Sequence, residues 1–331
     1  MAIIIGIEST AHTFGVAVIK NAKVLSNVRD IFTTEKGGLI PMEVKKHHEE
    51  VAPSIYQKAL TEAKILEKDV DCIAFSNAPG LAPCLLAGME FVKMKAKELS
   101  IPVVCVNHCI AHLEIGDMFG AKDPVMLYAS GANTQIIAYE AGKYRVFGET
   151  LDLGVGNFID TFARFLGLGF PGGPKIQKLA EECKNKDKLI ELPYSIKGMD
   201  VSFSGIQTKL KTLFNKGVPL EDLCFSLQEH VFAMLVEAAE RAIAHTGKKE
   251  LLLGGGVACN NRLQEMCKLM CEARGVRFIC PNREFLVDNA GMIGYLGEKM
   301  FLKNLYYDVA DLDVVDISPR ERTDDIIINW K

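Results

Sequence analysis

The stretch that decides the fold is IIIGIESTAHTFGVAVIKNAKVLSNVRD, residues 3–30. It predicts an apolar strand, a turn of small and hydroxyl residues, a second apolar strand, a tight turn and a third strand. VMLYASGANTQIIAYEAGKYRVFGETLD, residues 125–152, repeats this pattern with similar spacing. A three-strand unit that occurs twice predicts a fold built from two similar halves.

Alternating helix-like and strand-like segments follow each unit. The pattern predicts helices at 47–64, 83–99, 156–168, 173–183, 225–247 and 261–275, and further strands at 71–77, 101–107, 250–256 and 276–281. Two halves of this kind predict an α/β fold of two lobes, with a ligand cleft between them. We place the lobes at residues 1–124 and 125–301, and we expect residues 302–331 to return to the first lobe.

Length and composition describe a globular protein with a large core. The 331 residues are 49% hydrophobic and 24% charged, which suits two domains better than one. A net charge of -4 supplies no overall positive field, which argues against a stand-alone nucleic-acid binder. Apolar runs are far shorter than the roughly 20 residues that span a bilayer, and the first residues lack a basic signal region. We therefore expect a cytoplasmic protein without a membrane partner.

The ten cysteines include no C-x-x-C pair. Without a secretion signal, buried reduced thiols are a better interpretation than a disulfide framework. Cys105 and Cys109 flank His108, but this spacing fits no common zinc site.

Three turns are candidates for binding an anion. GIEST (6–10) and SGANT (130–134) place backbone N–H groups and hydroxyls between strands, where a pair of such turns is able to hold phosphate. LLLGGGVACNNRL (251–263) leads a strand through three glycines into a helix. Each also fits an ordinary turn, the last one capped by Asn260.

His108 and His112 stand four residues apart in VNHCIAH (106–112). On a helix, this spacing brings both side chains to one face, where they are able to share a metal ion. A hydrogen-bonded or solvated pair remains the alternative. A zincin-type protease is disfavoured because Cys109 stands where its glutamate base would be.

Seven motifs in order resemble one family over nearly the whole chain. They are GIESTAHT (6–13), VNHCIAH (106–112), LYASGANT (127–134), GFPGGP (169–174), MDVSFSG (199–205), GGGVACNNRL (254–263) and FLVDNAGMIGYLG (285–297). Together they resemble the universal tRNA threonylcarbamoyladenosine transferase family, and more closely its archaeal and eukaryotic branch, the catalytic subunit of the KEOPS complex. The resemblance implies an ASKHA fold, the architecture of actin, sugar kinases and Hsp70.

The resemblance implies an activity and partners. The family transfers threonylcarbamoyl from threonylcarbamoyl-adenylate to N6 of the adenosine 3′ of the anticodon in tRNAs that read ANN codons. It implies tRNA as substrate and a KEOPS-type assembly with a kinase-like ATPase, a dimerising subunit and a small regulator. We therefore expect low activity from the isolated chain.

The resemblance also implies a metal centre. His108, His112, Asp288 and Tyr128 match the family's metal-binding positions, and the first three are the expected catalytic residues. Imidazole, carboxylate and phenolate ligands suit one divalent metal, Fe(II) by preference or Zn(II). We expect this metal to orient the acyl donor and to polarise its carbonyl.

A nucleotide pocket for ATP, AMP or the adenylate is implied in the second half. We expect Asp160 at the ribose, although a solvated aspartate near the start of a helix is its alternative. The other matching residues are Ser130, Gly131 and Asn133 near the phosphate, with Tyr128, Ala129 and Ala132 in the same segment, then Gly173, Gly255, Gly256 and Asn260 around the nucleoside, and Gln177 as a contact to the ribose.

The chain departs from the family pattern at three of these positions. Ala132 stands where the family usually has glycine, Gln177 where it has an acid, and Thr161 where it often has lysine. Ala132 therefore puts the nucleotide geometry in question, and Gln177 keeps a hydrogen bond without a charge.

Two further motifs predict structural roles. His47 and His48 match a family pattern, and we expect them to begin a helix and to be structural or to face a partner. Ser202 or Ser204 is expected to cap a helix that carries Lys209 and Lys211, and these two lysines are expected to form a basic fringe for tRNA.

Two other classes of function fit the same fold. A small-molecule kinase would need a phosphoryl acceptor pocket and a magnesium carboxylate, and would not need the histidine pair. A nucleotide-switched scaffold would tolerate alanine at His108.

Overall fold

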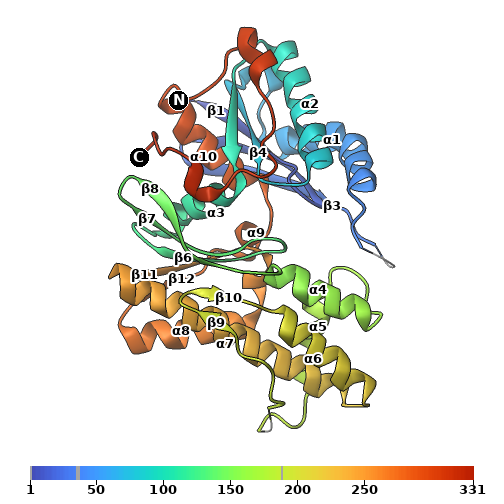
Figure 1. The fold of residues 1–331 in the computed structure, drawn as a ribbon. Helices are drawn as coiled ribbons and strands as arrows, with labels where there is room; N and C mark the ends of the chain where they lie inside the picture. Colours follow the sequence, from blue (N-terminus) through green and yellow to red (C-terminus); the bar gives the residue numbers. More distant parts are fainter. Residues whose placement is uncertain (1, 35–37, 188) are drawn as a thin grey trace. The chain divides into compact units, whose positions relative to one another are not determined.

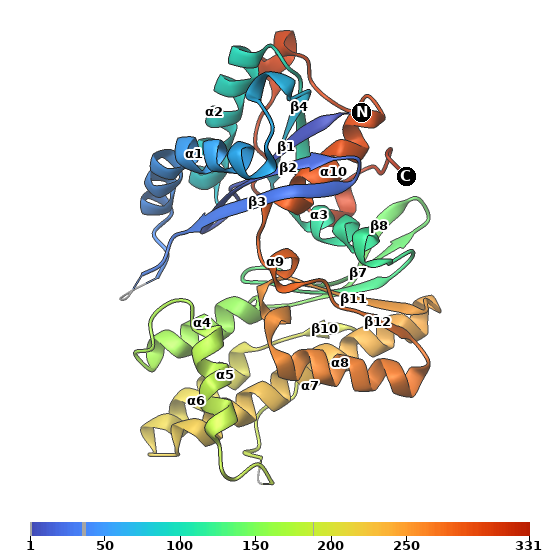
Figure 2. The same ribbon diagram turned by 180° about the vertical axis from the view of Figure 1, so that it is seen from behind.

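The computed structural model describes residues 2–34, 38–187 and 189–331. The chain divides into two compact units (Figure 1; Figure 2). Unit 1 consists of Met1–Thr33, Leu39–Met118 and Asp288–Lys331, and unit 2 of Thr34–Gly38 and Phe119–Val287.

Unit 1 is built on a five-stranded mixed sheet with the order β3-β2-β1-β4-β5. The strand β1 runs antiparallel to β2 and parallel to β4, while β2 pairs antiparallel with β3 and β4 pairs parallel with β5. The strands are β1 (Ile3–Glu8), β2 (Thr13–Lys20), β3 (Lys23–Ile31), β4 (Cys72–Ala78) and β5 (Val103–Asn107).

Helices cover both faces of this sheet. Ile5 and Ile7 of β1 pack in one core with Tyr56 and Val92, from the helices on the first face. The helix α10 contacts β1, β2, β4 and β5 together with α3, on the other face (Figure 1). The helices of unit 1 are α1 (Pro41–Ala63), α2 (Ala82–Leu99), α3 (His108–Glu114) and α10 (Ala290–Leu302), with short 3-10 turns η1 (Glu67–Asp69), η4 (Val309–Val314) and η5 (Thr323–Asp325), while η2 (Ile115–Phe119) ends at the limit of the unit.

A glycine lets α10 lie directly on β1. A Cβ atom at Gly6 would lie 2.3 Å from the carbonyl oxygen of Ala290 and 2.4 Å from the backbone nitrogen of Gly294. Only a residue without a side chain permits this approach of strand and helix backbones. Because Asp288 lies two residues before the first residue of α10, this contact also helps to set where Asp288 lies.

Unit 2 has the equivalent strand order, which reads β8-β7-β6-β11-β12 when it starts from the edge that corresponds to β3. The pairs β6–β7 and β7–β8 are antiparallel, and the pairs β11–β6 and β11–β12 are parallel. This agreement confirms the duplicated α/β halves. The strands are β6 (Val125–Ala129), β7 (Thr134–Glu140), β8 (Lys143–Glu149), β11 (Glu250–Gly254) and β12 (Arg277–Ile279), with a separate pair β9 (Ile196–Lys197) and β10 (Asp200–Val201).

The long helix α7 organises the helical layer of unit 2, because α5, α6 and α8 all contact it and it also contacts β6, β7 and β8. Phe158 and Phe203 stack within the same core, with ring centroids 5.6 Å apart. The helices are α4 (Val155–Phe165), α5 (Gly173–Glu182), α6 (Ser204–Asn215), α7 (Leu220–Thr246), α8 (Asn261–Arg274) and α9 (Arg283–Leu286), with the 3-10 turn η3 (Gly256–Cys259).

Two predicted helix starts are wrong. The helix α1 begins at Pro41, so His47 and His48 lie inside it, because the proline suits its first turn. Neither Ser202 nor Ser204 caps α6. Instead, the carboxylate of Asp152 accepts hydrogen bonds from the backbone N–H groups of Phe203 and Ser204, each at 2.9 Å.

The compact units differ from the predicted lobes in where they place α10, which falls within the predicted second lobe at residues 125–301. Residues 288–301 belong to unit 1, together with the segment 302–331. The sequence places α10 after the second repeat, but its glycines allow it to pack on the sheet of the first.

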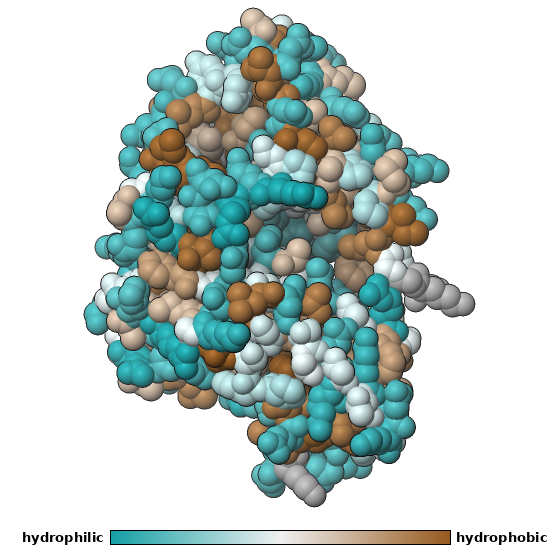
Figure 3. All heavy atoms as spheres, in the orientation of Figure 1, coloured by the Kyte–Doolittle hydropathy of each residue, from teal (hydrophilic) through white to brown (hydrophobic). Residues whose placement is uncertain are grey.

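The described part of the chain contains no helix that is both long and apolar enough to cross a membrane. All ten cysteines are free thiols, and burial raises the pKa of Cys271 and Cys280 to about 11. On the face drawn in Figure 3, hydrophobic residues are interspersed with hydrophilic ones, as is usual for protein surfaces.

Candidate functional site

The histidine pair is positioned by a capped helix start. Asn107 ends β5, and its side-chain oxygen accepts a hydrogen bond from the backbone N–H of Ile110 at 3.1 Å. This N-cap starts α3 at His108, so that His108 and His112 occupy one face a turn apart. Their ring centroids lie 4.9 Å apart, and both side chains are buried.

Asp288 completes a group of three candidate ligands in unit 1. Its Oδ1 atom lies 3.4 Å from Nε2 of His108 and 3.8 Å from Nε2 of His112. The ligand atoms of the three residues all lie within 4.8 Å of one another, and among the described residues no other cluster of His, Cys, Asp and Glu was found with such spacing. Two imidazoles and a carboxylate suit Fe(II) or Zn(II).

Glu8 orients His108 from behind. Its Oε2 atom lies 2.9 Å from Nδ1 of His108, so that Nδ1–H donates to the carboxylate and Nε2 faces Asp288. The other oxygen, Oε1, accepts from the backbone N–H of Thr10 at 2.7 Å and from its hydroxyl at 2.5 Å. Glu8 is fully buried. This pattern is typical of the carboxylate that supports a metal-binding histidine.

Electrostatics in this group also fit a cation. Burial disfavours the charged form of His108, but Glu8 and Asp288 outweigh it and hold the pKa of His108 well above its ordinary value. Burial lowers the pKa of His112, and Asp288 opposes this only in part. Burial alone would raise the pKa of Asp288, yet the two histidines hold it well below its ordinary range. The fully buried carboxylate of Glu8 and the half-buried carboxylate of Asp288 therefore create a site that favours positive charge, which a divalent cation would match.

Sequence reasoning missed Glu8. It lies in GIEST, which we interpreted as a phosphate turn, but the N–H and hydroxyl of Thr10 are bonded to Glu8. The available signal is a charged residue at the end of an otherwise apolar strand, a position that burial makes costly without a partner.

Tyr128 lies in unit 2, in β6, and is fully buried opposite Gln135 and Gly254. Its role as a fourth ligand stays a prediction.

The predicted phosphate turn of unit 2 packs on the start of α4. The backbone N–H groups of Gly156 and Asn157 donate to the carbonyl oxygens of Ser130 and Gly131, at 3.0 and 2.9 Å. Within the turn, the N–H of Ser130 donates to the carbonyl of Asn133 at 2.9 Å. Ala132 is exposed, so its extra methyl group does not disturb the packing of the turn.

The glycine turn after β11 lies against the same segment. Gly255 has a φ of 91°, and a Cβ atom there would lie 2.3 Å from the carbonyl oxygen of Ala129. Gly256 begins η3, and nothing lies within 4 Å of where its Cβ would be. The structure therefore brings Ala129, Ser130 and Gly131 together with Gly255.

Asn260 has a structural function in the described contacts. Its side-chain oxygen accepts from the N–H of Arg262 at 2.9 Å, and its amide donates to Oε1 of Gln228 at 3.0 Å. It caps α8, as the alternative interpretation of LLLGGGVACNNRL predicted.

Asp160 lies one turn beyond Asn157 on α4 and holds the start of α5. Its Oδ1 atom accepts from the N–H of Gly172 at 2.7 Å, directly before Gly173. Gln177 lies on α5, where its amide donates to Glu181 at 2.9 Å. Thus Asp160 and Gly173 lie together, while Gln177 is bonded along its own helix.

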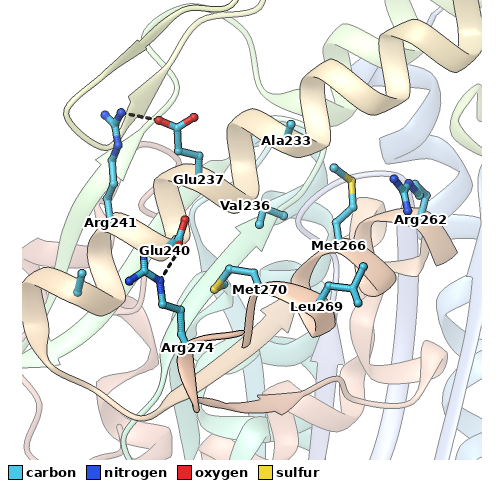
Figure 4. A pocket seen from close by; sticks show the side chains of 11 residues that line it. Ala233, Val236, Glu237, Glu240, Arg241, Arg262, Met266, Leu269, Met270 and Arg274 are labelled. Carbon is cyan, nitrogen blue, oxygen red and sulfur yellow. Dashed lines mark hydrogen bonds and ion pairs between the residues drawn. The ribbon is translucent and has the colours of Figure 1, made fainter. Parts of the chain in front are cut away.

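Two other surface features of unit 2 lie apart from these residues. A groove of about 780 Å³ between α7 and α8 is lined in part by Met266, Leu269 and Met270 (Figure 4). Its lining includes none of the predicted site residues. On α6, Nζ of Lys211 lies 5.4 Å from the ring centroid of Phe165.

Comparison with known proteins finds relatives whose names agree with one another. The family model described as TsaD: tRNA N6-adenosine threonylcarbamoyltransferase matches residues 23–295. A tRNA N6-adenosine threonylcarbamoyltransferase of Thermococcus sibiricus is 51% identical over 329 residues, covering 99% of this chain and 100% of the relative. A probable bifunctional tRNA threonylcarbamoyladenosine biosynthesis protein of Methanosarcina mazei is 49% identical over 99% of this chain, which spans 59% of that relative.

Solved structures share the fold at low identity. HypF of T. kodakarensis aligns with a TM-score of 0.63 at 15% identity, over 92% of this chain and 48% of that chain. The activator of the 2-hydroxyisocaproyl-CoA dehydratase from Clostridium difficile, with bound ADPNP, aligns with a TM-score of 0.56 at 10% identity, over 96% and 99% of the two chains. These likenesses support the two-lobed ASKHA architecture.

Proposed function

Because this chain belongs to the tRNA N6-adenosine threonylcarbamoyltransferase family, we propose a metal-assisted transfer at the group formed by His108, His112 and Asp288. The donor is threonylcarbamoyl-adenylate, and the acceptor is N6 of the adenosine 3′ of the anticodon in tRNAs that read ANN codons. The observation that carries the proposal is the cluster of three ligand atoms, two of them from buried histidines, with Glu8 behind His108.

The reaction joins a weak nucleophile to an activated acyl group. The N6 nitrogen forms a bond to the carbamoyl carbon, the bond from that carbon to the phosphate oxygen breaks, and AMP leaves while the amine loses a proton. When bound, a divalent metal, Fe(II) by preference or Zn(II), supplies Lewis-acid polarisation of the carbamoyl carbonyl. The aromatic amine is a weak nucleophile, so holding it next to the carbamoyl carbon contributes much of the rate.

The residues of unit 1 provide a prepared ligand set. Glu8 fixes His108 in the tautomer that leaves Nε2 free of a proton for a metal, because Nδ1–H is bonded to the carboxylate. The first turn of α3 places His112 beside it, and Asp288 supplies the anionic ligand. The charges of Glu8 and Asp288 then balance those of a divalent cation. We extend the set to Tyr128 on the family resemblance alone.

The nucleotide half of the donor is assigned to unit 2. We propose that Ser130, Gly131 and Asn133 approach the phosphate, and that Asp160 approaches the ribose. The packing of the 130–133 turn on the start of α4 supports this, because it places the turn beside the helix that carries Asp160. Asp160 lies on the same helix, one turn further along.

We also propose that the chain works in the cytoplasm within a KEOPS-type assembly of a kinase-like ATPase, a dimerising subunit and a small regulator. The net charge of -4 supports a requirement for partners in holding tRNA, because a polyanion is bound chiefly through positive charge.

The test supplies threonylcarbamoyl-adenylate labelled in its threonine to the chain and its partner subunits, and counts label in tRNA. We expect transfer with wild type and a loss of at least about 100-fold with His108→Ala, since a metal ligand and its Lewis acidity are removed. Lys95→Met, on α2, is the control and is expected to transfer normally. Equal transfer by wild type and His108→Ala contradicts the metal-assisted proposal.

A further inference from the structure

The helix α3, which carries His108 and His112, contacts α10, which follows Asp288, at a second point away from the three ligands. Lys299 lies near the end of α10, and its Nζ atom is 2.6 Å from Oε2 of Glu114, the last residue of α3. The same nitrogen is 2.5 Å from Oδ2 of Asp117 and 4.9 Å from the ring centroid of Tyr295. All of these groups belong to unit 1.

The other oxygen of Glu114 is held by the C-terminal segment. The indole Nε1–H of Trp330 donates to Oε1 at 3.2 Å, and Trp330 is itself 7% exposed. Nζ of Lys331 lies 3.5 Å from the same oxygen. The side chain of Glu114 is 0% exposed, so its carboxylate is bonded on both sides within the protein.

Stability alone does not explain this arrangement. A buried carboxylate loses its hydration, and at the C-terminal end of a helix it also meets the unfavourable end of the helix dipole. A pair of well-packed apolar side chains would often serve stability as well as a buried ion pair does. What the ion pair and the indole hydrogen bond add is direction, since each fixes the position of one carboxylate oxygen.

The direction matters because α3 is short. A helix of 7 residues does not hold its own orientation, and its neighbours must supply it. His108 begins this helix, and Glu114 ends it about 9 Å further along at the usual rise per residue. Asp288 precedes the start of α10, and Lys299 lies about 14 Å beyond that start. A contact at each end fixes both the rotation and the register of α3 against α10.

We propose that Glu114, Lys299 and Trp330 are positioning residues for the metal centre. They set the helix that carries His108 and His112 against the helix that follows Asp288, and so hold the three ligands at metal-binding spacing. This inference rests on the metal centre proposed above.

The experiment measures Co²⁺ binding to the purified full-length chain, by absorption spectrum and by competition with a chelator. The central variant is the double substitution Glu114→Leu with Lys299→Met, which removes both charges and leaves neither unpaired in the interior. Trp330→Phe removes the indole donor and part of the ring but leaves both charges in place, and it serves if the double variant does not fold. The matched control is Lys95→Met, which removes the lysine of another ion pair in unit 1, with Glu67 at 3.0 Å.

We expect the double variant and Trp330→Phe to bind Co²⁺ about 10-fold more weakly or worse, the size usual for outer-shell changes at metal sites, with an altered spectrum. The single variant Lys299→Met should also bind Co²⁺ more weakly than wild type. Lys299→Arg keeps the positive charge and is expected to retain most of the affinity that Lys299→Met loses. The melting temperature of the metal-free double variant should stay near that of wild type, which separates positioning from folding.

Each alternative result has one meaning. Wild-type affinity and spectrum in the double variant and in Trp330→Phe overturn the inference, and so does an equal loss of affinity in Lys95→Met. His108→Ala and Asp288→Ala test the metal centre itself. If these two bind Co²⁺ as wild type does, the proposed metal centre fails before the positioning residues are in question.

Discussion

Glu8 determines the tautomer of His108, because both of its oxygens are engaged. One accepts from Thr10 and the other from Nδ1–H of His108. A glutamine in its place has a single acceptor oxygen. If that oxygen stays with Thr10, its amide faces Nδ1 as a donor, and the proton of His108 moves to Nε2, the nitrogen needed for a metal.

We therefore predict that Glu8→Gln lowers the affinity for Co²⁺ or Zn²⁺ by about 10- to 100-fold. The two side chains have nearly the same shape, so the melting temperature of the metal-free protein should change little. Chelator competition gives the affinity, and Glu49→Gln on the exposed face of α1 is the control. An unchanged affinity would show that the carboxylate does not support the ligand.

His48 is buried, and it takes part in a chain of hydrogen bonds beside the turn between β1 and β2. Its Nε2–H donates to the carbonyl of Ala11 at 2.9 Å, its Nδ1 lies 3.3 Å from Nδ1 of His47, and Nε2 of His47 lies 2.7 Å from Asp30. Burial lowers the pKa of His48 to about 4, with the Ala11 carbonyl opposing and His47 adding to the effect. His48 is therefore neutral in the folded protein.

This predicts a pH dependence of stability with a definite sign. The unfolded chain takes up a proton on His48 near pH 6.5, while the folded chain does so only near its pKa of about 4. The contribution of His48 is thus complete above pH 6.5, falls as the pH drops toward 4, and is then constant, a change of about 3 kcal/mol. Denaturant unfolding from pH 7 to pH 4 measures it.

His48→Gln is the comparison for this pH dependence, because it keeps a donor for Ala11 without a titratable ring. The nearby titratable groups His47, His12 and Glu8 are present in both proteins. We expect the free energy of unfolding of the variant to fall less steeply below pH 6.5 than that of wild type. Parallel curves for the two proteins would mean that His48 takes up its proton at the same pH in the folded and unfolded states, which contradicts a lowered pKa.

At the scale of elements, the contact of α10 with β1 depends on Gly6. A methyl group there meets backbone atoms of Ala290 and Gly294 at 2.3 and 2.4 Å, and backbone atoms cannot rotate away. We predict that Gly6→Ala destabilises the protein by about 1–3 kcal/mol or more through overpacking. Because Asp288 precedes α10, Co²⁺ affinity should fall as well.

Gly15 in the neighbouring strand β2 is the matched control for this prediction. The nearest atoms to a Cβ atom there lie at 3.4 Å, so Gly15→Ala should be near neutral. Urea unfolding gives both values. If Gly6→Ala is as stable as Gly15→Ala, then α10 does not rest on β1 as described.

At the scale of the whole molecule, the proposed ligand set of unit 1 is held by protein contacts before any metal binds. Glu8, the Asn107 cap and the Glu114–Lys299 pair all act within the chain. We therefore predict that chelation abolishes transfer of label to tRNA but leaves the far-ultraviolet circular dichroism unchanged. Adding back Fe(II) or Zn(II) separately identifies the metal that restores activity. Full transfer by chelated protein would contradict a metal requirement.

The sequence predicted the duplicated halves because apolar strands separated by small polar turns have a strong local signature. It also predicted that His108 and His112 share a helix face, since that depends only on their spacing. Family membership supports the transferase and removes the support for the kinase and scaffold alternatives.

Other parts of the site depend on contacts between distant residues, which periodicity does not show. Asp288 reaches the histidines because Gly6 admits α10, and Glu8 looked like a turn residue until its partner His108 was placed 2.9 Å away. The cap of α6 comes from Asp152, about fifty residues earlier, instead of from a local serine. Tyr128, by contrast, came from the family resemblance and still awaits its test.

The shared strand order of the two sheets has a consequence for how the chain diversified. In one copy of the repeat the first strand ends in a carboxylate, Glu8, and in the other it ends in Ala129, before a turn of Ser, Gly and Asn. The two copies share their strand topology, but they differ in the residue that ends the first strand. An internal duplication of this kind lets the two turns change independently, because mutations in one turn leave the other intact.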